Sequence, residues 1–308
     1  MAHNTEQHAP APVLDNGAGD TSRDVSVNRL VAAGGDVASE SESEAVGVRR
    51  GRGCGGCGGC GGAGLGALGE LSRQMASEAG GTLLLLLLTC LPAAPAAPLL
   101  LRATTAGLVV ALLVQCFDHI SGAMFNPTVT LAAVVAGRLG AARAGALVAA
   151  QAAGAAGAAA ALALLAPAGS PAACVTRPAA DMPVFQALCV EAVLGGCLAL
   201  ANCAAWDARN RRLLDSWPLR IGLAVTALSL VGGDLTGASM NPMRSLGPAM
   251  CSGDWTSHWI YWVGPLLGSA LCSAGYRALW AAPPRAPPRG HSPPPARRPP
   301  PGKLFAPA

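Results

Sequence analysis

Long apolar stretches separated by short polar loops fill the middle of the chain. Each stretch is close to the ~20 residues that a helix needs to cross a bilayer. Apolar spans are therefore expected at residues 75–97, 101–121, 143–166, 184–206, 217–235 and 256–280. Two further apolar stretches, from Asn126 to Ala136 and from Asn241 to Cys251, are too short to cross. They predict re-entrant half-helices in an all-α membrane protein.

One motif occurs twice, once before each short stretch. Ser-Gly-Ala-Met-Phe-Asn-Pro ends at Pro127, and Thr-Gly-Ala-Ser-Met-Asn-Pro ends at Pro242. Proline suits the first turn of a helix, where no backbone donor is lost. Asn126 and Asn241 are therefore predicted N-caps, with their side chains at the positive ends of the two helix dipoles.

The repeat extends beyond the motif, because Glu78 precedes the first copy at nearly the distance at which Glu191 precedes the second. Each half holds three spans and one half-helix. Three crossings is an odd number, so the halves are predicted to be inverted, and their asparagines to meet near the midplane. Both glutamates are expected to accept hydrogen bonds from loop donors, with proton relay as the alternative. His119 is expected to bond buried loop backbone, with pH gating as its alternative.

This arrangement predicts a pathway for neutral solutes. Two helix N-termini and two amide donors beside one path attract the oxygen of water or of a hydroxyl compound, whereas a proton or other cation meets a positive potential. Arg244, three residues after Asn241, adds a permanent cation, and the cost of burying it within the membrane indicates a function. The matching residue of the first half is the apolar Val129.

The flanking regions have a different composition. Residues 1–72 predict a disordered arm, residues 73–281 the channel domain, and residues 282–308 a disordered Pro/Arg-rich tail. Cys54, Cys57 and Cys60 lie in a glycine run that is interpreted as a linker, with a metal or lipidation site as the alternative. The segment from Pro293 to Pro301 is a candidate SH3-type docking site. Arginines gather in alternate loops, which places both termini in the cytoplasm.

Composition narrows the function classes further. A chain with 52% hydrophobic and 12% charged residues is too apolar for an ordinary soluble protein. The eleven cysteines lie mostly in apolar stretches and are interpreted as packing residues in a lipid or reducing setting, without a disulfide framework. The spans contain no nucleophile–base pair, phosphate loop or metal constellation, so we expect neither an enzyme nor a cofactor, and no nucleic-acid partner.

The paired Asn-Pro boxes resemble those of the aquaporin superfamily, over about residues 75–280. Further residues carry the same resemblance: Glu78, Gln151, Glu191, Arg244 and the run from Trp259 to Pro265. The resemblance implies a right-handed bundle of six transmembrane helices and two half-helices, assembled as a homotetramer with one pore per subunit. We expect such a protein in the plasma membrane.

The resemblance also implies a selectivity filter made of Ala106, Ser229, Ala238 and Arg244. Water-selective members usually have Phe at the first of these positions and His at the second. Small residues there imply a wider mouth that favours glycerol, urea or a similar polyol, with water passing as well. The filter is similar to that of the insect entomoglyceroporins.

Other positions depart from the family patterns. Ser245, Ala249, Tyr261 and Trp262 stand where classical glycerol channels have other residues. Thr128 and Met243 replace the alanines of the two boxes, and Met243 either narrows the midplane or packs elsewhere. Three alternatives to a polyol channel therefore remain: a water-selective channel, a membrane scaffold or adhesion protein with a closed pore, and an ion-coupled transporter.

Overall fold

The computed structural model describes residues 60–94 and 97–282, and these residues form helices without any strand. The elements are α1 (Cys60–Cys90), α2 (Leu99–Ser121), α3 (Pro127–Val135), α4 (Ala141–Leu165), α5 (Ser170–Cys174), α6 (Val184–Trp206), the 3₁₀ helix η1 (Ala208–Ser216), α7 (Trp217–Thr236), α8 (Pro242–Ser252) and α9 (Ile260–Leu279). The expectations for Cys54, for Cys57 and for the segment 293–301 fall outside the described residues.

The six long helices correspond to the six predicted spans. Four of them, α2, α4, α6 and α7, are long and apolar enough to cross a membrane by length and hydropathy alone. The other two, α1 and α9, carry the fully buried Glu78 and Ser269, and fully buried polar side chains also lie on α4 and α6. The last helix begins at Ile260, later than the expected residue 256.

The first helix corrects both boundaries of the first predicted span. It begins at Cys60, so residues 60–72 are helical and do not belong to the expected disordered arm. Leu71 and Met75, one turn apart, pack against the core, and Glu70 bonds Arg73 and Gln74 across the same turn. The helix ends at Cys90, two residues before Pro92, because a proline cannot continue the hydrogen-bond ladder.

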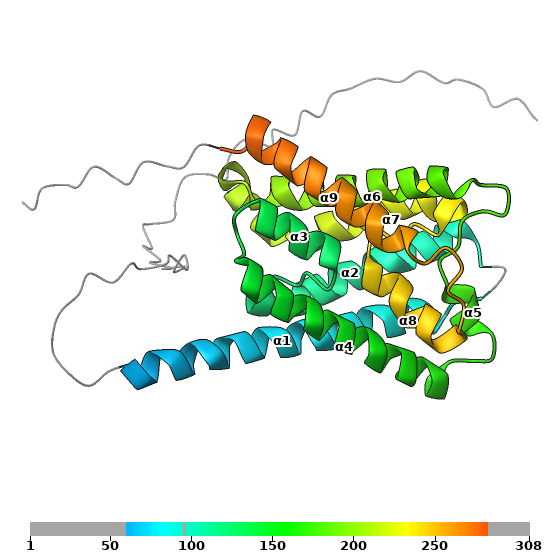
Figure 1. The fold of residues 1–308 in the computed structure, drawn as a ribbon, viewed down its shortest axis with the longest axis horizontal. Coiled ribbons are helices and arrows are strands. Elements are labelled where there is room, and N and C mark those ends of the chain that lie inside the picture. The colour runs from blue at the N-terminus through cyan, green and yellow to red at the C-terminus, as the bar shows by residue number, and fades with distance from the viewer. Residues whose placement is uncertain (1–59, 95–96, 283–308) are drawn as a thin grey trace, which may run out of the picture. The chain divides into compact units, whose positions relative to one another are not determined.

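The two halves of the chain pack in matching ways. Helix α1 lies against α4 as α6 lies against α9, while α2 packs on α7 across the two halves. The half-helix α3 contacts α6 and α9 of the second half, and α8 contacts α1 and α4 of the first. The half-helices extend from the middle of the bundle toward opposite ends (Figure 1). This is the inverted repeat that the sequence predicts.

Glycines allow matching close approaches in the two halves. A methyl group on Gly154 of α4 would overlap the carbonyl oxygen of Ala79 on α1. In the second half, a methyl group on Gly268 of α9 would overlap the carbonyl oxygen of Ala192 on α6. Ala79 and Ala192 each follow the glutamate of their half, so these contacts fix both glutamates close to the neighbouring helix.

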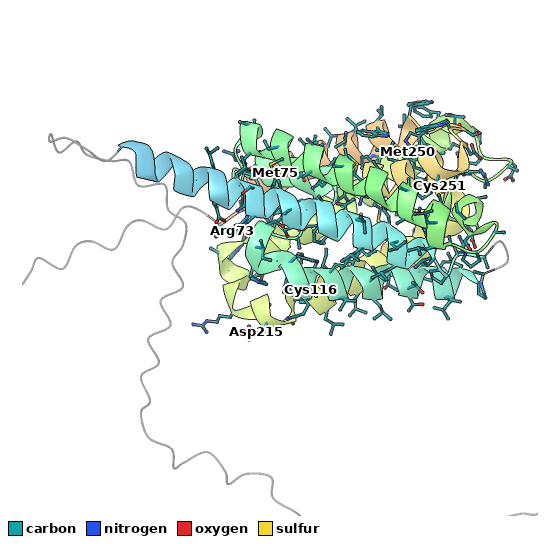
Figure 2. All side chains as sticks on the ribbon, turned by 90° about the horizontal axis from the view of Figure 1, so that it is seen from below. Arg73, Met75, Cys116, Asp215, Met250 and Cys251 are labelled. Atoms are coloured by element: carbon teal, nitrogen blue, oxygen red, sulfur yellow. A yellow bond between two sulfur atoms is a disulfide. The ribbon has the colours of Figure 1, made fainter. Side chains whose placement is uncertain are left out.

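The two ends of the bundle carry different groups. Figure 2 places Arg73 and Asp215 at one end and Cys251 at the other. The Asp215 end also holds η1, whose residue Arg209 donates to the backbone carbonyl oxygen of Trp280 just after α9. The opposite end holds α5, a helix of five residues that the sequence did not predict.

A disulfide joins Cys90, the last residue of α1, to Cys174, the last residue of α5. The expectation of packing cysteines in a lipid or reducing setting, without a disulfide framework, is therefore wrong for this pair. Eighty-four residues separate the two cysteines, and they meet only because α4 returns the chain to the end of α1. The remaining cysteines with described side chains are free thiols.

Candidate functional site

The loops that precede the two half-helices have the same backbone conformation. Gly122 and Gly237 end α2 and α7 with φ values of 88° and 81°. The residues after them include four with positive φ, which are Ala123 (44°), Phe125 (48°), Ala238 (44°) and Met240 (53°). Side-chain-bearing residues adopt this region at a cost, so surrounding contacts must hold the loops in place.

In the first half those contacts centre on Glu78, whose side chain is fully buried. Its Oε1 accepts from the amide N–H of Met124 at 3.0 Å and from the Ser121 hydroxyl at 2.6 Å. Its Oε2 accepts from the amide N–H of Phe125 at 2.7 Å and from Nε2 of Gln151 at 2.8 Å. Four donors on two oxygens satisfy the carboxylate and fix the loop.

Glu191 has the same position in the second half and is also fully buried. Its Oε1 accepts from the amide N–H of Ser239 at 2.9 Å and from the Thr236 hydroxyl at 2.7 Å. Its Oε2 accepts from the amide N–H of Met240 at 2.9 Å. The Tyr261 hydroxyl donates to the Thr236 carbonyl oxygen at 2.8 Å and so supports the end of α7. Both glutamates hold loop donors in place.

The two asparagines meet through reciprocal bonds. Each cap oxygen accepts from the amide N–H two residues later, at 2.8 Å for Asn126 and at 2.9 Å for Asn241. The Nδ2 atom of Asn126 donates to the carbonyl oxygen of Met240, and Nδ2 of Asn241 donates to that of Phe125, both at 3.0 Å. Pro127 and Pro242 occupy the first turn of each half-helix. The positive ends of α3 and α8 therefore lie at one place.

A cavity of about 190 Å³ opens from this meeting point. Asn126 and Asn241 lie on its wall, together with all four residues of the expected filter, which are Ala106, Ser229, Ala238 and Arg244. It is also lined by Thr89 on α1 and Arg102 on α2. Among its described lining residues there is no Phe, Tyr, Trp or His. Small and aliphatic side chains thus form most of the wall, which also carries the guanidinium groups of Arg102 and Arg244.

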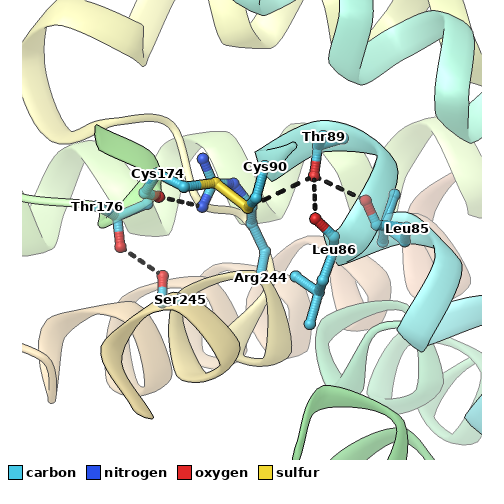
Figure 3. Close-up of a disulfide and its surroundings, with 8 residues drawn as sticks. All are labelled: Leu85, Leu86, Thr89, Cys90, Cys174, Thr176, Arg244 and Ser245. Atoms are coloured by element: carbon cyan, nitrogen blue, oxygen red, sulfur yellow. Dashed lines mark hydrogen bonds between the residues drawn. A yellow bond between two sulfur atoms is a disulfide. The ribbon is translucent and has the colours of Figure 1, made fainter. Parts of the chain in front are cut away.

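The guanidinium of Arg244 is held by backbone. Its Nη1 donates to the carbonyl oxygen of Cys174 at 2.7 Å (Figure 3). Beside it, the hydroxyls of Thr176 and Ser245 lie 2.7 Å apart, and those of Ser245 and Ser239 lie 2.6 Å apart. The segment after α5 is therefore tied to the half-helix α8. The sequence analysis missed Cys174 and Thr176, since only the fold brings them to α8.

Neither residue that replaces an alanine of the boxes faces the cavity. Met243 is 1% exposed and packs with Leu86, Ala155 and Ala158. Thr128 is fully buried, and its carbonyl oxygen accepts from the Ser269 hydroxyl of α9 at 2.7 Å. Of the two alternatives for Met243, the structure therefore favours packing over narrowing of the midplane.

His119 does not lie where it was expected. It is exposed in the last turn of α2, and no hydrogen bond of its side chain is found within residues 60–94 and 97–282. The expected buried bond to loop backbone is therefore wrong. The side chain that bonds the backbone of the first loop is instead Ser121, whose hydroxyl accepts from the amide N–H of Ala123 at 3.1 Å.

Charged groups outside the spans are paired at both ends of the bundle. Asp254 accepts from the amide N–H of Thr256 and pairs with Arg177 at 2.5 Å, and these contacts lower its pKa to about 2. Asp207 pairs with Arg209 at 2.7 Å, and its pKa is likewise held well below the ordinary range.

Burial lowers the pKa of His258, whose Nε2 accepts from Nε1 of Trp262 at 3.1 Å.

Comparison with known proteins gives a consistent result. The family model described as major intrinsic protein matches residues 68–276. The chain is similar to "Probable aquaporin TIP4-2" of Oryza sativa subsp. japonica, with 41% identity over 173 residues, which is 56% of this chain and 67% of the relative. It is 38% identical to "Aquaporin-4" of Bos taurus over 171 residues, which is 55% of this chain and 53% of that relative.

A solved structure shares the fold. The X-ray structure of the aquaglyceroporin from Plasmodium falciparum matches with a TM-score of 0.61 and 20% identity. The match covers 68% of this chain and 96% of that one. The described helices thus have the architecture of six transmembrane helices and two re-entrant half-helices.

Proposed function

Because this chain belongs to the major intrinsic protein family, we propose that it is a passive channel for small neutral solutes such as glycerol or urea, through which water also passes. The family assignment makes it an integral multi-pass membrane channel and not an enzyme. Which solute passes is a separate question, and the answer depends on the wall of the cavity beside Arg244.

The observation that carries this choice is the composition of that wall. Ala106, Ser229 and Ala238 surround the approach to Arg244 with small side chains, and the described lining residues include no aromatic ring. A ring at this place would narrow the path to water. Without one, a three-carbon polyol fits, and its hydroxyls meet the guanidinium and the two asparagine amides while its carbons face aliphatic wall.

Exclusion of ions follows from the same geometry. Two half-helix N-termini and the charge of Arg244 create a positive potential along the path. Glu78 and Glu191 do not offset it by binding a driving cation, since their oxygen atoms already accept from loop and side-chain donors. These contacts favour a passive channel over an ion-coupled transporter.

The strongest alternative is a water-selective channel, because the two sequence relatives described above are named aquaporins. A closed scaffold or adhesion protein is the other alternative. Swelling of liposomes that contain the purified protein distinguishes them. Glycerol or urea entry, with sucrose excluded, supports our proposal. Water flux alone would favour the first alternative, and the absence of any flux the second.

The filter assignment has its own test. We expect Ala106→Phe combined with Ser229→His to abolish glycerol entry and preserve water flux, since both side chains project into one cavity. Leu108→Phe is the matched control, because Leu108 is 61% exposed on the same helix. Unchanged glycerol flux in the double variant would show that the filter lies elsewhere.

We further propose a homotetramer in the plasma membrane with both termini in the cytoplasm. Arg138, Arg209 and Arg277 lie at one end of the bundle, as expected of the cytoplasmic end. The disulfide lies at the other end, where an oxidising compartment preserves it. Chemical crosslinking and protease access to tagged termini test these points, and binding of an isolated SH3 domain tests residues 293–301.

A further inference from the structure

The disulfide and the filter arginine share one backbone segment. Cys174 contributes its sulfur atom to the bond with Cys90 and its carbonyl oxygen to the bond with Nη1 of Arg244 (Figure 3). Both cysteines are buried, at 0% and 3% exposed. One residue therefore connects a covalent crosslink to the charged group that lines the cavity.

The same segment is part of the cavity wall. Cys174, Val175 and Thr176 all line the cavity, together with Arg244. Helix α5 has five residues and no side-chain cap, so its own hydrogen bonds fix it weakly. The disulfide ties its last residue to α1, which is 31 residues long. The crosslink thus fixes the Cys174 end of this wall, while Thr176 ties the following segment to Ser245 on α8.

Few other hydrogen-bond acceptors are available to the Arg244 guanidinium. Within the part of the chain that the structure describes, Arg244 forms no salt bridge and donates its side-chain hydrogen bond to the Cys174 carbonyl oxygen. A buried guanidinium that loses an acceptor must replace it, because an unpaired charged donor is costly. The replacements at hand are water in the cavity and the hydroxyls of a permeating solute.

We propose that the Cys90–Cys174 disulfide determines the specificity of the channel by holding the Cys174 carbonyl against Arg244. A dithiol reductant opens it by thiol–disulfide exchange: the two cysteines gain two electrons and two protons and become thiols, and the reductant becomes a disulfide. Arg244 then turns toward the lumen and binds passing polyols, which slows glycerol more than water. The predicted effect on glycerol permeability rests on the proposed function.

The test uses the full-length protein in liposomes, with glycerol and water permeability measured before reduction, after dithiothreitol and after reoxidation. We expect reduction to lower the ratio of glycerol to water permeability roughly three- to tenfold, as the net loss of one ordinary hydrogen bond implies, because water in the cavity replaces part of the lost contact of Arg244. Reoxidation should restore the ratio. Cys90→Ser should show the low ratio without reductant, whereas Cys116→Ser, which alters an exposed free cysteine, should respond like the parent.

A second variant separates this role from general stabilisation. Arg244→Val installs the residue type found at the matching position, Val129, and removes the group that the carbonyl holds. Reduction should then change neither permeability. An equal response with and without Arg244, or no response in the parent, would overturn the inference. If the oxidised parent carries water and no glycerol, the proposed function fails, and an Arg244-dependent change of water permeability still decides the role of the disulfide.

Discussion

The side-chain amide of Asn126 donates a 3.0 Å hydrogen bond to the carbonyl oxygen of Met240, in the opposite half of the chain. The side-chain amide of Asn241 donates the equivalent hydrogen bond to the carbonyl oxygen of Phe125, also at 3.0 Å. An asparagine amide carries two N–H donors, so each residue keeps one for a solute in the cavity that both line. Structural and transport functions thus use different hydrogens of one group.

Replacing both asparagines by alanine should remove the caps, the cross-half bonds and the two donors. We expect a loss of about 1 kcal/mol per cap and a strong decrease of solute flux. Asn241→Ser is the matched control, because serine also caps a helix but does not reach the Phe125 carbonyl. Liposome swelling and thermal unfolding measure the two effects. Parental polyol flux in a folded double alanine variant would contradict the proposed pathway.

Glu78→Gln should destabilise the first loop. The NH₂ group of the glutamine would replace a carboxylate oxygen that accepts two hydrogen bonds, and it would face both donors. We therefore expect a loss of about 2–3 kcal/mol of stability. Glu70→Gln, on the same helix and partly exposed, should lose much less. Unfolding of both variants in detergent checks the difference, and equal stability would show that the carboxylate is dispensable.

Gly268→Ala should weaken the packing of α9 on α6, since the added methyl group overlaps the backbone of Ala192. A cost of about 1–3 kcal/mol is expected from overpacking. Gly275→Ala on the same helix meets no atom within 4 Å and should be neutral or slightly stabilising. The order of the two unfolding temperatures is the readout, and the reverse order would contradict the close helix contact.

Acid should destabilise the loop before α9 through His258. Burial lowers its pKa, so the unfolded chain binds a proton more readily than the folded one. The stability that the neutral ring provides is therefore complete above the ordinary pKa and is lost as pH falls through the lower folded value. Protonated His258 also has no lone pair to accept from Trp262.

We expect the unfolding temperature of the parent to fall below about pH 6.5, the ordinary pKa of histidine. His258→Gln should lose part of this dependence, because a neutral amide oxygen accepts from the indole at any pH. The measurement is unfolding temperature against pH for both proteins. An identical acid slope would assign the effect to other groups.

Ala238→Cys should make the channel sensitive to mercurials. The side chain lines the cavity beside Arg244, and a nearby cation favours the reactive thiolate. The parent should be blocked weakly, since its exposed thiols Cys116, Cys189 and Cys197 are absent from the described cavity wall. Ala238→Ser controls for side-chain size. Strong block of the parent that Cys116→Ser abolishes would place the reactive thiol elsewhere.

The sequence predicted those features that depend on local signals. Helix α7 was expected at 217–235 and runs from Trp217 to Thr236, because Pro218 in its first turn and Gly237 at its C-cap mark both ends. The half-helices and their asparagine caps were predicted for the same reason. The inverted halves followed from an odd number of spans, which is a constraint of topology.

Features that depend on tertiary packing could not be predicted. The helical start of α1 lies in a glycine-rich segment, and only the contacts of Leu71 and Met75 with the core reveal why it is ordered. The exposure of His119 depends on which face of α2 meets α7 and α1. The partner of Arg244 lies 70 residues away, on a segment that the disulfide joins to α1.

The reciprocal asparagine bonds bear on how such a chain could arise. A half-length protein with one loop would present an amide and a carbonyl that nothing in the same half can pair. A second copy inserted in the opposite direction would pair both at once. Gene duplication and fusion of a dual-topology dimer would therefore preserve the contact, and later changes such as Val129 and Arg244 could then give the two mouths separate chemistry.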